Sequence, residues 1–575
     1  MSASKDKEES SPRLAETMLY TSVELSSGSP SIYHLRMREE MRRGEAMIAK
    51  QSIGKPYRIG RGEIEKVFMV VGATGAGKST LINGMVNYVL GVQWNDEFRF
   101  KLITEESKAS QAHSQTQYIT AYTFYPMKGS AVPFAFTIID TPGFGGTEGL
   151  ERDKKITEQI KEFFSIAPPD GIDHLDCIGF VVPSSQPRLT PTQKYIFDSI
   201  LSIFGNDVAK NIFMMITFAD GQRPPVLEAI KEANIPGGGE RFFKFNNSAL
   251  FAENKDSGEL SFDEMFWKMG LSSFRKFFEE FPKVESVSLR LTKEVLQERE
   301  ELYCLIEGLN DQITLGLNKI EEIRQEEIVL QQREKEIQTN KDFTYSIDVT
   351  KPVYTSLEGT GQHTTTCIPC NKTCHKDCKI PDDDRKQKCW AMDKLTGECR
   401  ICPRKCHWSE HKNRPYLIEY KTETETRTVE DLKKKYHRAV KEKATSEKMM
   451  KSIEESLQKV HEEVLTMIKK AQQSLRRLDE IALKPNPLTQ VDYLEILIES
   501  EKAEAKSGWK QRVKYLEVAK GHAETLSKVK DEKESQNLIK KLSRDVDVQE
   551  EEKARDAMEK LSLSGDKWYR RFKFW

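Results

Sequence analysis

The sequence has almost no net charge and no long hydrophobic run. Its 575 residues include 89 Lys+Arg and 90 Asp+Glu, which gives a formal net charge of -1. No overall field would therefore attract nucleic acid or anionic lipid, and either partner would need a local patch of charge. No stretch approaches the roughly 18 consecutive apolar residues that a membrane-spanning helix needs. The N-terminus is charged and polar, unlike a signal sequence, so we expect a cytoplasmic protein.

Cysteine is scarce outside one short segment. Eight of the ten cysteines lie between Cys367 and Cys406, and we expect the other two, Cys177 and Cys304, to be buried thiols. Proteins of the cytoplasm rarely keep disulfides, so a local cluster of cysteines favours metal binding.

Changes of composition predict several structural units. Apolar runs such as 67–71 and 136–140 alternate with helix-like segments, as the buried strands of a parallel sheet do. We expect a flexible tail and lead-in at 1–58, the α/β domain at 59–282, a coiled-coil helix at 283–345, a Cys/His-rich module at 346–427, a returning coiled-coil helix at 428–484 and a C-terminal helical region with a basic-aromatic tail at 485–575. The predicted fold class is thus an α/β domain with a mainly parallel sheet and helices on both faces, followed by a long α-helical coiled coil with a small zinc-binding insert.

Two segments with heptad spacing flank the cysteines, from Ile306 to Ile337 and from Met450 to Ile481. An antiparallel coiled-coil hairpin with the cysteines at its tip is the economical interpretation. The alternative is that these helices fold back as a bundle on the α/β domain. The last residues, 567–575, mix aromatic and basic side chains, which is typical of weak contact with a membrane surface or of a tail docked on the fold.

The run at 67–71 leads into a complete G-x-x-x-x-G-K-S pattern. Its residues are Gly72, Ala73, Thr74, Gly75, Ala76, Gly77, Lys78, Ser79 and Thr80. Because the pattern follows a strand and precedes a helical segment, it predicts a loop whose backbone N–H groups surround phosphates. Lys78 would bring a positive charge to the β- and γ-phosphate oxygens, and Ser79 a hydroxyl to Mg²⁺.

A second motif follows the run at 136–140. Asp140 would hold Mg²⁺ through water, and the amide of Gly143 would contact a γ-phosphate. Thr116 is the expected mobile ligand of Mg²⁺, with Ser110 and Ser114 as alternatives. The predicted catalytic groups are Lys78, Thr116 and Gly143.

These motifs recur in the order used by GTPases. The phrase TIIDTPGFG resembles the septins, the immunity-associated GTPases (GIMAP) and the Toc GTPases of chloroplast import, and the resemblance covers about residues 60–282. It implies that Asp220 bonds the guanine N1 and exocyclic amine, two adjacent donors that adenine does not present. Phe218 stands where the family has lysine, so packing over the base would be lost. Asn247 is the candidate in the last base-contacting loop.

Phe144 occupies the position at which Ras-like GTPases carry a glutamine that orients water. A phenyl ring cannot do this, so we expect a GTP hydrolase with low intrinsic activity. The resemblance also implies a homodimer, because in these families the nucleotide faces of two subunits pair.

The cysteine cluster contains an internal repeat. Its candidate ligands are Cys367, Cys370, Cys374 and Cys378, then Cys399, Cys402, Cys406 and His411. These spacings suit tetrahedral zinc, and we expect two structural ions, one held by four cysteines and one by three cysteines and a histidine. Cys389, His375 and His407 are alternative ligands, and a disulfide cluster is the alternative chemistry.

Three functions follow from these motifs. The first is a switch that binds GTP/GDP and Mg²⁺ and controls assembly, with the zinc module meeting an unknown protein partner. The second is a DNA-tethering ATPase of the SMC type with a zinc hook, although the order of the motifs is that of a GTPase. The third is a nucleotide-bound scaffold without turnover. The charge distribution makes no strong case for nucleic acid.

Overall fold

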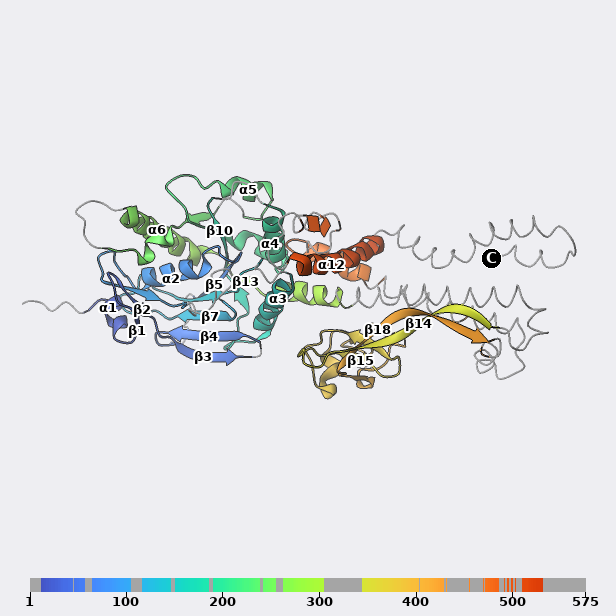
Figure 1. Ribbon diagram of the computed structural model, residues 1–575. Helices are drawn as coiled ribbons and strands as arrows, with labels where there is room; N and C mark the ends of the chain where they lie inside the picture. The colour runs from blue at the N-terminus through green and yellow to red at the C-terminus, as the bar shows by residue number, and fades with distance from the viewer. Residues whose placement is uncertain are drawn as a thin grey trace, which may run out of the picture. The chain divides into compact units, whose positions relative to one another are not determined.

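The computed structural model describes residues 12–56, 65–104, 116–145, 150–185, 190–237, 241–254, 262–304, 344–428, 471–485 and 509–530, without 45, 303 and 403, together with single positions between 431 and 502. The chain forms two compact units, Met1–Gln297 with Leu478–Gly521 and Glu298–Arg477 with His522–Trp575 (Figure 1). Each is described by itself.

The elements of the first unit are α1 (Leu14–Leu19), β1 (Val23–Ser26), β2 (Ser31–His34), β3 (Arg38–Arg43), β4 (Ile48–Ile53), β5 (Glu65–Gly72), α2 (Lys78–Val89), β6 (Phe98–Lys101), β7 (Ile119–Phe124), β8 (Ala135–Asp140), α3 (Leu150–Ser165), β9 (His174–Leu175), β10 (Cys177–Pro183), α4 (Pro191–Leu201), η1 (Asn206–Asn211), β11 (Ile212–Thr217), α5 (Val226–Glu232), β12 (Phe242–Lys244), η2 (Asn247–Phe251), α6 (Phe262–Glu280), η3 (Phe281–Lys283) and β13 (Val287–Ser288). Those of the second are β14 (Thr344–Ser356), β15 (Thr365–Cys367), β16 (Lys372–His375), η4 (Asp383–Lys388), η5 (Trp408–Glu410), β17 (His411–Lys412) and β18 (Tyr416–Thr428). Helix α12 spans Trp509–Lys530.

The first unit is built on an eight-stranded sheet with the order β12-β11-β10-β5-β8-β7-β4-β3. Strand β5 lies in the middle and runs parallel to β8 and β10, whereas β7 is antiparallel to β8 and β3 to β4. Strands β5, β8, β10 and β11 are almost entirely buried, which explains their continuous apolar runs. Because these neighbours are parallel, the loops that follow them meet at one edge of the sheet.

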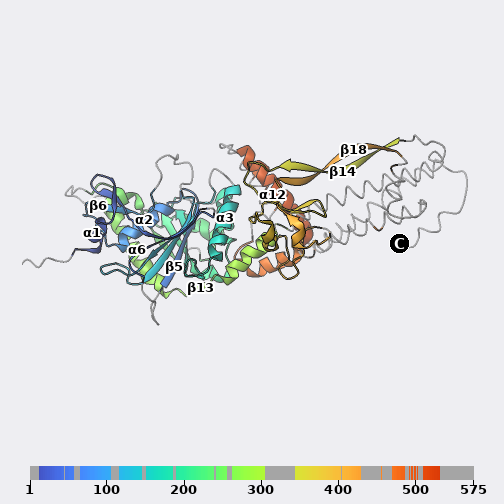
Figure 2. The ribbon, with the colours of Figure 1, turned by 90° about the horizontal axis from the view of Figure 1, so that it is seen from below.

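Helices cover both faces of this sheet, as the sequence predicts. On one face, Phe68 of β5 packs in a cluster with α2 and α6, and its ring centroid lies 5.0 Å from that of Phe277. On the other, Phe180 of β10 stacks on Phe197 of α4 at 4.6 Å. Figure 2 shows α2 and α6 on one side of the sheet and α3 on the other.

The N-terminal residues extend this domain, so the predicted tail and lead-in at 1–58 is wrong for the described residues 12–56. Strand β4 pairs in parallel with β7, and its Ile48 and Ala49 are buried. Strands β1 and β2 form a second, three-stranded sheet with β6. The edge strand β3 has the charged sequence REEMRR, so this part of the chain contains no apolar run that would predict a strand.

A buried ion pair connects the start of β5 to the chain that follows α6. The Lys66 ammonium lies 2.8 Å from Asp176 Oδ1 and donates to the carbonyl of Val284 at 2.6 Å. Asp176 also accepts bonds from the backbone N–H of Val67 and the hydroxyl of Ser286. The chain that leaves α6 is therefore fixed to the sheet before residues 290–304, which are helical where described.

A distant segment returns to the first unit. Leu483 donates its backbone N–H to the carbonyl of Phe204 at 3.0 Å, and the Asn206 side chain donates to the carbonyl of Glu480 at 2.8 Å. The end of the predicted returning helix thus packs on the α/β domain. The described heptad positions Ala471, Leu478 and Ile481 are all buried.

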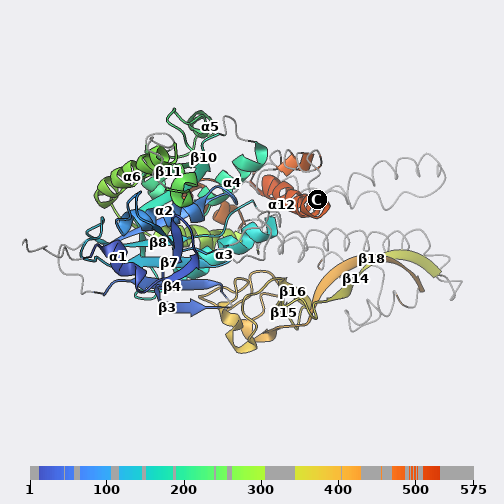
Figure 3. The ribbon, with the colours of Figure 1, turned by 60° about the vertical axis from the view of Figure 1, so that its left-hand side comes forward.

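The second unit contains a long ribbon and a small three-stranded sheet (Figure 3). Strands β14 and β18 pair antiparallel over thirteen residues each. The order of the small sheet is β16-β15-β17. The sheet contacts the ribbon where the hydroxyl of Thr373 on β16 accepts a hydrogen bond from the backbone N–H of Ile418 on β18 at 2.9 Å. We did not predict the ribbon, although its alternating Thr, Val and Glu residues have the period of a strand.

Most of the predicted coiled coil and the tail at 567–575 lie outside the described residues. Within the part that the structure describes, no helix combines the length and the apolar character needed to cross a bilayer.

Candidate functional site

The G-x-x-x-x-G-K-S residues form the turn between β5 and α2. Gly77 precedes the helix with φ of 91°, a left-handed conformation that favours glycine. Lys78, Ser79 and Thr80 form the first turn of α2, whose N-terminal N–H groups and dipole favour an anion. The hydroxyl of Thr217, at the end of β11, donates to the carbonyl of Ala76 at 2.7 Å and supports the turn from the side.

Lys78 and Asp140 lie in a buried part of this edge. The Lys78 ammonium donates to the carbonyls of Gly72 at 3.1 Å and Ala73 at 2.9 Å. Burial lowers the pKa of Lys78 and raises the pKa of Asp140, and the opposite charge of each partner partly offsets both shifts. Asp140 Oδ1 is buried and has no hydrogen-bond partner among the described atoms. A carboxylate oxygen in this situation fits a cation such as Mg²⁺.

The segment after Asp140 lies directly on the phosphate loop. The backbone N–H of Thr74 donates to the carbonyl of Phe144 at 2.9 Å, and the N–H of Phe144 donates to the carbonyl of Gly72 at 3.2 Å. A Cβ at Gly143 would lie only 2.6 Å from Thr74 Oγ1, so this approach requires glycine. The structure therefore brings Lys78, Asp140 and Gly143 to one place.

Phe144 has no exposed surface, and its ring belongs to the core. The next residue, Gly145, donates its N–H to Asp153 Oδ1 of α3 at 2.9 Å. Asp153 is buried, and it is a functional candidate that the sequence search missed because one acidic residue in a charged helix carries no pattern.

Thr116 stands just before β7, and its carbonyl accepts a bond from Arg152 of α3 at 3.5 Å. The structure places its carbonyl beside α3. Its alternatives Ser110 and Ser114 lie outside the described residues.

The base-recognition candidates follow β11 and β12. Asp220 is exposed, and its Oδ1 accepts the N–H of Gln222 at 2.8 Å. Phe218 is 58% exposed with φ of 51°, which is rare for a bulky residue. Such strain is found at functional sites more often than elsewhere.

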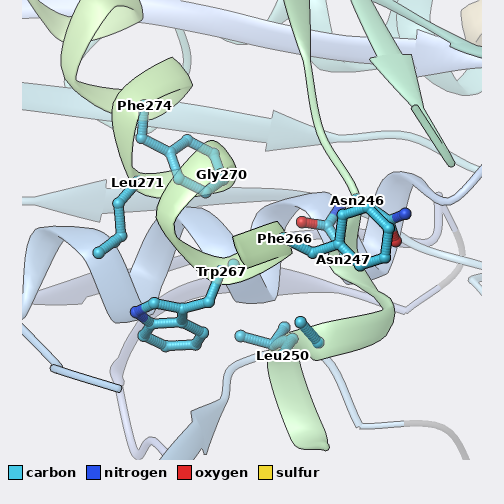
Figure 4. A pocket seen from close by; sticks show the side chains of 10 residues that line it. Asn246, Asn247, Leu250, Phe266, Trp267, Gly270, Leu271 and Phe274 are labelled. Atoms are coloured by element: carbon cyan, nitrogen blue, oxygen red, sulfur yellow. The ribbon is translucent and has the colours of Figure 1, made fainter. Parts of the chain in front are cut away.

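Asn247 lies beside a small pocket between η2, α2 and α6 (Figure 4). Its Oδ1 would be 3.2 Å from a Cβ at Gly84 of α2. The pocket is lined mainly by apolar side chains, including Trp267 and Phe274. Asn247 thus packs against α2 in this structure, and this contact does not show a role in base binding.

The cysteine module brings its ligands together across the two sequence repeats. The ligand atoms form two sets, and within each set they all lie within 4.8 Å of one another: Cys367, Cys370, Cys402 and Cys406, and Cys374, Cys399, Cys402 and His411. Cys402 belongs to both sets. All ten cysteines are free, which argues against the disulfide alternative.

His411 has the geometry of a metal ligand. Its Nδ1 lies 3.0 Å from the carbonyl of His407, which fixes the proton on Nδ1, and its buried Nε2 has no hydrogen-bond partner among the described atoms. The backbone N–H groups of Ile401 and Cys402 both point at Cys399 Sγ at 3.4 Å. Hydrogen bonds from neighbouring thiols lower the pKa of Cys402 to about 5. These groups permit a metal ion.

Seven of the eight predicted ligands are in these two sets, and the remaining one, Cys378, lies apart from them. It forms a third group with His375 and Cys389, which we had considered only as alternatives. His407 does not join any group and contacts the Ser409 hydroxyl at 2.9 Å.

Comparison with protein families finds the family described as Septin over residues 62–165, less than half of the chain. Two similar solved structures are of Toc33 from Arabidopsis thaliana. The one in complex with Mg²⁺ and GMPPNP is 15% identical, with 39% of this chain and 88% of that chain covered and a TM-score of 0.25. The one with GDP and Mg²⁺ is 14% identical, with 36% and 84% covered and a TM-score of 0.23. A likeness of this degree carries no argument about activity.

No curated protein matches the chain. The Septin match covers β5, the phosphate loop, Asp140 and all of α3. The first unit therefore contains a P-loop GTPase domain.

Proposed function

We propose that this protein binds GTP and GDP with Mg²⁺ and that the bound nucleotide controls its assembly, with the cysteine module as a zinc-stabilised recognition arm. The buried pair of Lys78 and Asp140 is the observation that carries the proposal. Lys78 follows the loop after β5, Asp140 ends the paired strand β8, and both are buried, which supports roles in holding phosphate and Mg²⁺. The bound metal would neutralise phosphate charge, and Ser79 and Asp140 are the residues to hold it.

Guanine selectivity is proposed for Asp220. Its carboxylate follows β11 on the same edge as the phosphate loop and is open to solvent. Only a base with two adjacent donors, such as guanine, matches two carboxylate oxygens. Phe218 is exposed beside it and offers a flat apolar face in place of the usual lysine.

Hydrolysis is proposed to be slow. The buried Phe144 ring cannot orient a water molecule, and Gly143 offers only its backbone. The resemblance to septins implies that a second copy of the chain pairs through the nucleotide face, so hydrolysis would depend on dimerisation. Thr116 would move toward Mg²⁺ only in the triphosphate-bound protein.

Zinc is proposed because the module offers thiolates and imidazole at tetrahedral spacing. Sites with four protein ligands leave no position for catalysis, so the ions would stabilise a surface for a protein partner. We place the protein in the cytoplasm, where cysteines are kept as thiols.

The identity of the bound nucleotide tests the proposal. Titrations of the purified full-length chain with fluorescent GDP, GTP analogue and ADP should show guanine preference, and Lys78→Ala should lose binding. Lys283→Ala is the matched control, because Lys283 is exposed and pairs only with Glu280 on the surface. Asp220→Asn should shift preference from guanine to xanthine nucleotides, since an amide donor matches the carbonyl that replaces the amine.

Mass measured by light scattering in each nucleotide state tests the assembly role. A larger species with the GTP analogue supports the switch. Guanine binding with constant mass would favour the inert scaffold. Preference for adenine nucleotides, or unchanged binding in Lys78→Ala, would overturn the proposal and favour the hook-type ATPase.

A further inference from the structure

The third group of ligands in the cysteine module belongs to neither of the two sets that share Cys402. It consists of His375 at the end of β16, Cys378 a few residues later and Cys389 after η4, and their ligand atoms all lie within 4.8 Å of one another. Cys378 and Cys389 are both buried. The two zinc ions expected from the sequence give these residues no common role.

The distances within the group are those of ligands around one ion. Cys378 Sγ lies 3.7 Å from Cys389 Sγ, and His375 Nδ1 lies 3.3 Å from Cys389 Sγ. A Zn–S bond of about 2.3 Å in a tetrahedral site separates two sulfurs by about 3.8 Å. The hydroxyl of Thr365 contacts Cys389 Sγ at 3.2 Å and can donate to it, as outer partners of metal ligands do.

A fourth thiol approaches this group from the helical residues 290–304. Cys304 is buried, and its thiol lies close enough to the His375 ring to interact with it. Three residues earlier, Glu301 pairs with Arg400 of the module at 2.7 Å. Residues three apart lie on the same face of a helix, so one face presents both groups to the module.

We propose that His375, Cys378, Cys389 and Cys304 bind a third zinc-class ion. A closed structural site has four ligands, and we assign the fourth to Cys304, whose thiol lies near His375 but outside the group of atoms within 4.8 Å and would move toward the ion. The module would then hold three ions, with Cys402 bridging the other two. The third ion would connect Cys304 to the module within the second unit, a cross-link that the cysteine repeat alone does not provide.

Zinc content of the purified full-length chain tests this inference. After dialysis against metal-free buffer, the wild type should retain three Zn²⁺ per chain and Cys389→Ser two. Cys177→Ala is the matched control, because Cys177 is a buried free thiol of β10 outside all three groups, and it should retain three. Two ions in the wild type, unchanged in Cys389→Ser, would overturn the proposal.

Cys304→Ser tests the fourth ligand separately. Loss of one Zn²⁺ supports it, whereas retention of three would remove Cys304 from the ligand set. Replacement with Co²⁺ gives a second readout, since the thiolate-to-cobalt absorption should fall by about a third in Cys389→Ser if three similar sites contribute.

Nucleotide binding shows that the first unit of these variants is folded, and the two ions that remain in the other sets show that the module is folded. A variant that loses one ion and still binds guanine nucleotide has lost only the site. If guanine binding fails in the wild type while three Zn²⁺ are present, the proposed function fails and this inference stands.

Discussion

Thr74 donates its backbone N–H to the carbonyl of Phe144 at 2.9 Å, and this amide belongs to the loop that surrounds phosphates. The carbonyl of Gly72 accepts the N–H of Phe144 in return at 3.2 Å. A phosphate that takes the Thr74 amide must displace the Phe144 carbonyl. If this loop binds phosphate as proposed, phosphate binding and the position of the segment after Asp140 would be coupled, while the buried Phe144 ring anchors that segment to the core.

Gly143→Ala should disturb this coupling. The added Cβ would meet Thr74 Oγ1 at 2.6 Å and the Thr74 backbone N at 2.8 Å, so the two loops must separate. We expect the affinity for a GTP analogue to fall by about tenfold, or about 1.4 kcal/mol, and that for GDP to fall less, because GDP has no γ-phosphate at Gly143. Competition titrations measure both values. Gly44→Ala is the control, since a Cβ there meets nothing within 4 Å; equal losses for both nucleotides would contradict the argument.

Asp153 should make stability depend on pH. Burial raises its pKa to about 7, against smaller opposing effects of the Gly145 N–H, the Tyr195 hydroxyl and the charge of Arg152. The folded chain thus keeps a proton that the unfolded chain releases above about pH 4, so this carboxyl destabilises the fold as pH rises from about 4 to about 7. Above about 7 its contribution is constant.

Asp153→Asn removes this titration and keeps an acceptor for Gly145. The melting temperature of the wild type minus that of the variant should fall by about 4–8 °C between pH 5 and pH 7, which corresponds to about 2 kcal/mol. Thermal scans at pH 5, 6, 7 and 8 measure it. A difference that does not change with pH would show that Asp153 does not titrate in this range.

The local structure of the candidate phosphate site was predictable because its pattern lies within one short segment. Nine consecutive residues contain the turn, the lysine and the helix start, and Asp140 ends an apolar strand that can only pair with β5 or a close neighbour. The sheet edge that gathers these groups follows from the parallel pairing. The N-terminal extension was missed because Ile48 and Ala49 join the sheet within a strand that continues with the polar residues Lys50, Gln51 and Ser52.

The metal groups were predictable in composition and not in pairing. Spacing along the chain assigns ligands to sequence neighbours, whereas the small sheet pairs Cys367 of β15 with His411 of β17. The register between distant strands decides which thiols meet, and one sequence does not contain it. Because of this register, two ligand sets share Cys402, and Cys378 lies in a third group.

His411 and His407 should differ in their effect on zinc. His411→Ala removes a buried Nε2 from the set with Cys374, Cys399 and Cys402, so the chain should lose zinc or release it faster to a chelator. His407→Ala is matched, because it keeps the backbone carbonyl that His411 contacts and removes a side chain outside every group. Release followed with a colorimetric chelator measures both. Equal rates in the two variants would exclude His411 as a ligand.

Asp176→Ala should strongly destabilise the first unit, because it leaves the Lys66 ammonium buried without its charge partner. Removal of one member of a buried pair costs about 3–5 kcal/mol. The exposed pair of Lys283 and Glu280 is the control, since Glu280→Ala should cost at most about 1 kcal/mol. Urea unfolding followed by tryptophan fluorescence compares the two variants.

The double variant Lys66→Met with Asp176→Asn separates charge from packing. Methionine needs no charge partner, and asparagine keeps an oxygen that can accept the N–H of Val67, so much of the lost stability should return. If the double variant is no more stable than Asp176→Ala, the cost arises from the hydrogen bonds of Val67 and Ser286 that Asp176 accepts. The stability of this junction would then depend on backbone anchoring of the segment after α6 rather than on the buried charge of Lys66.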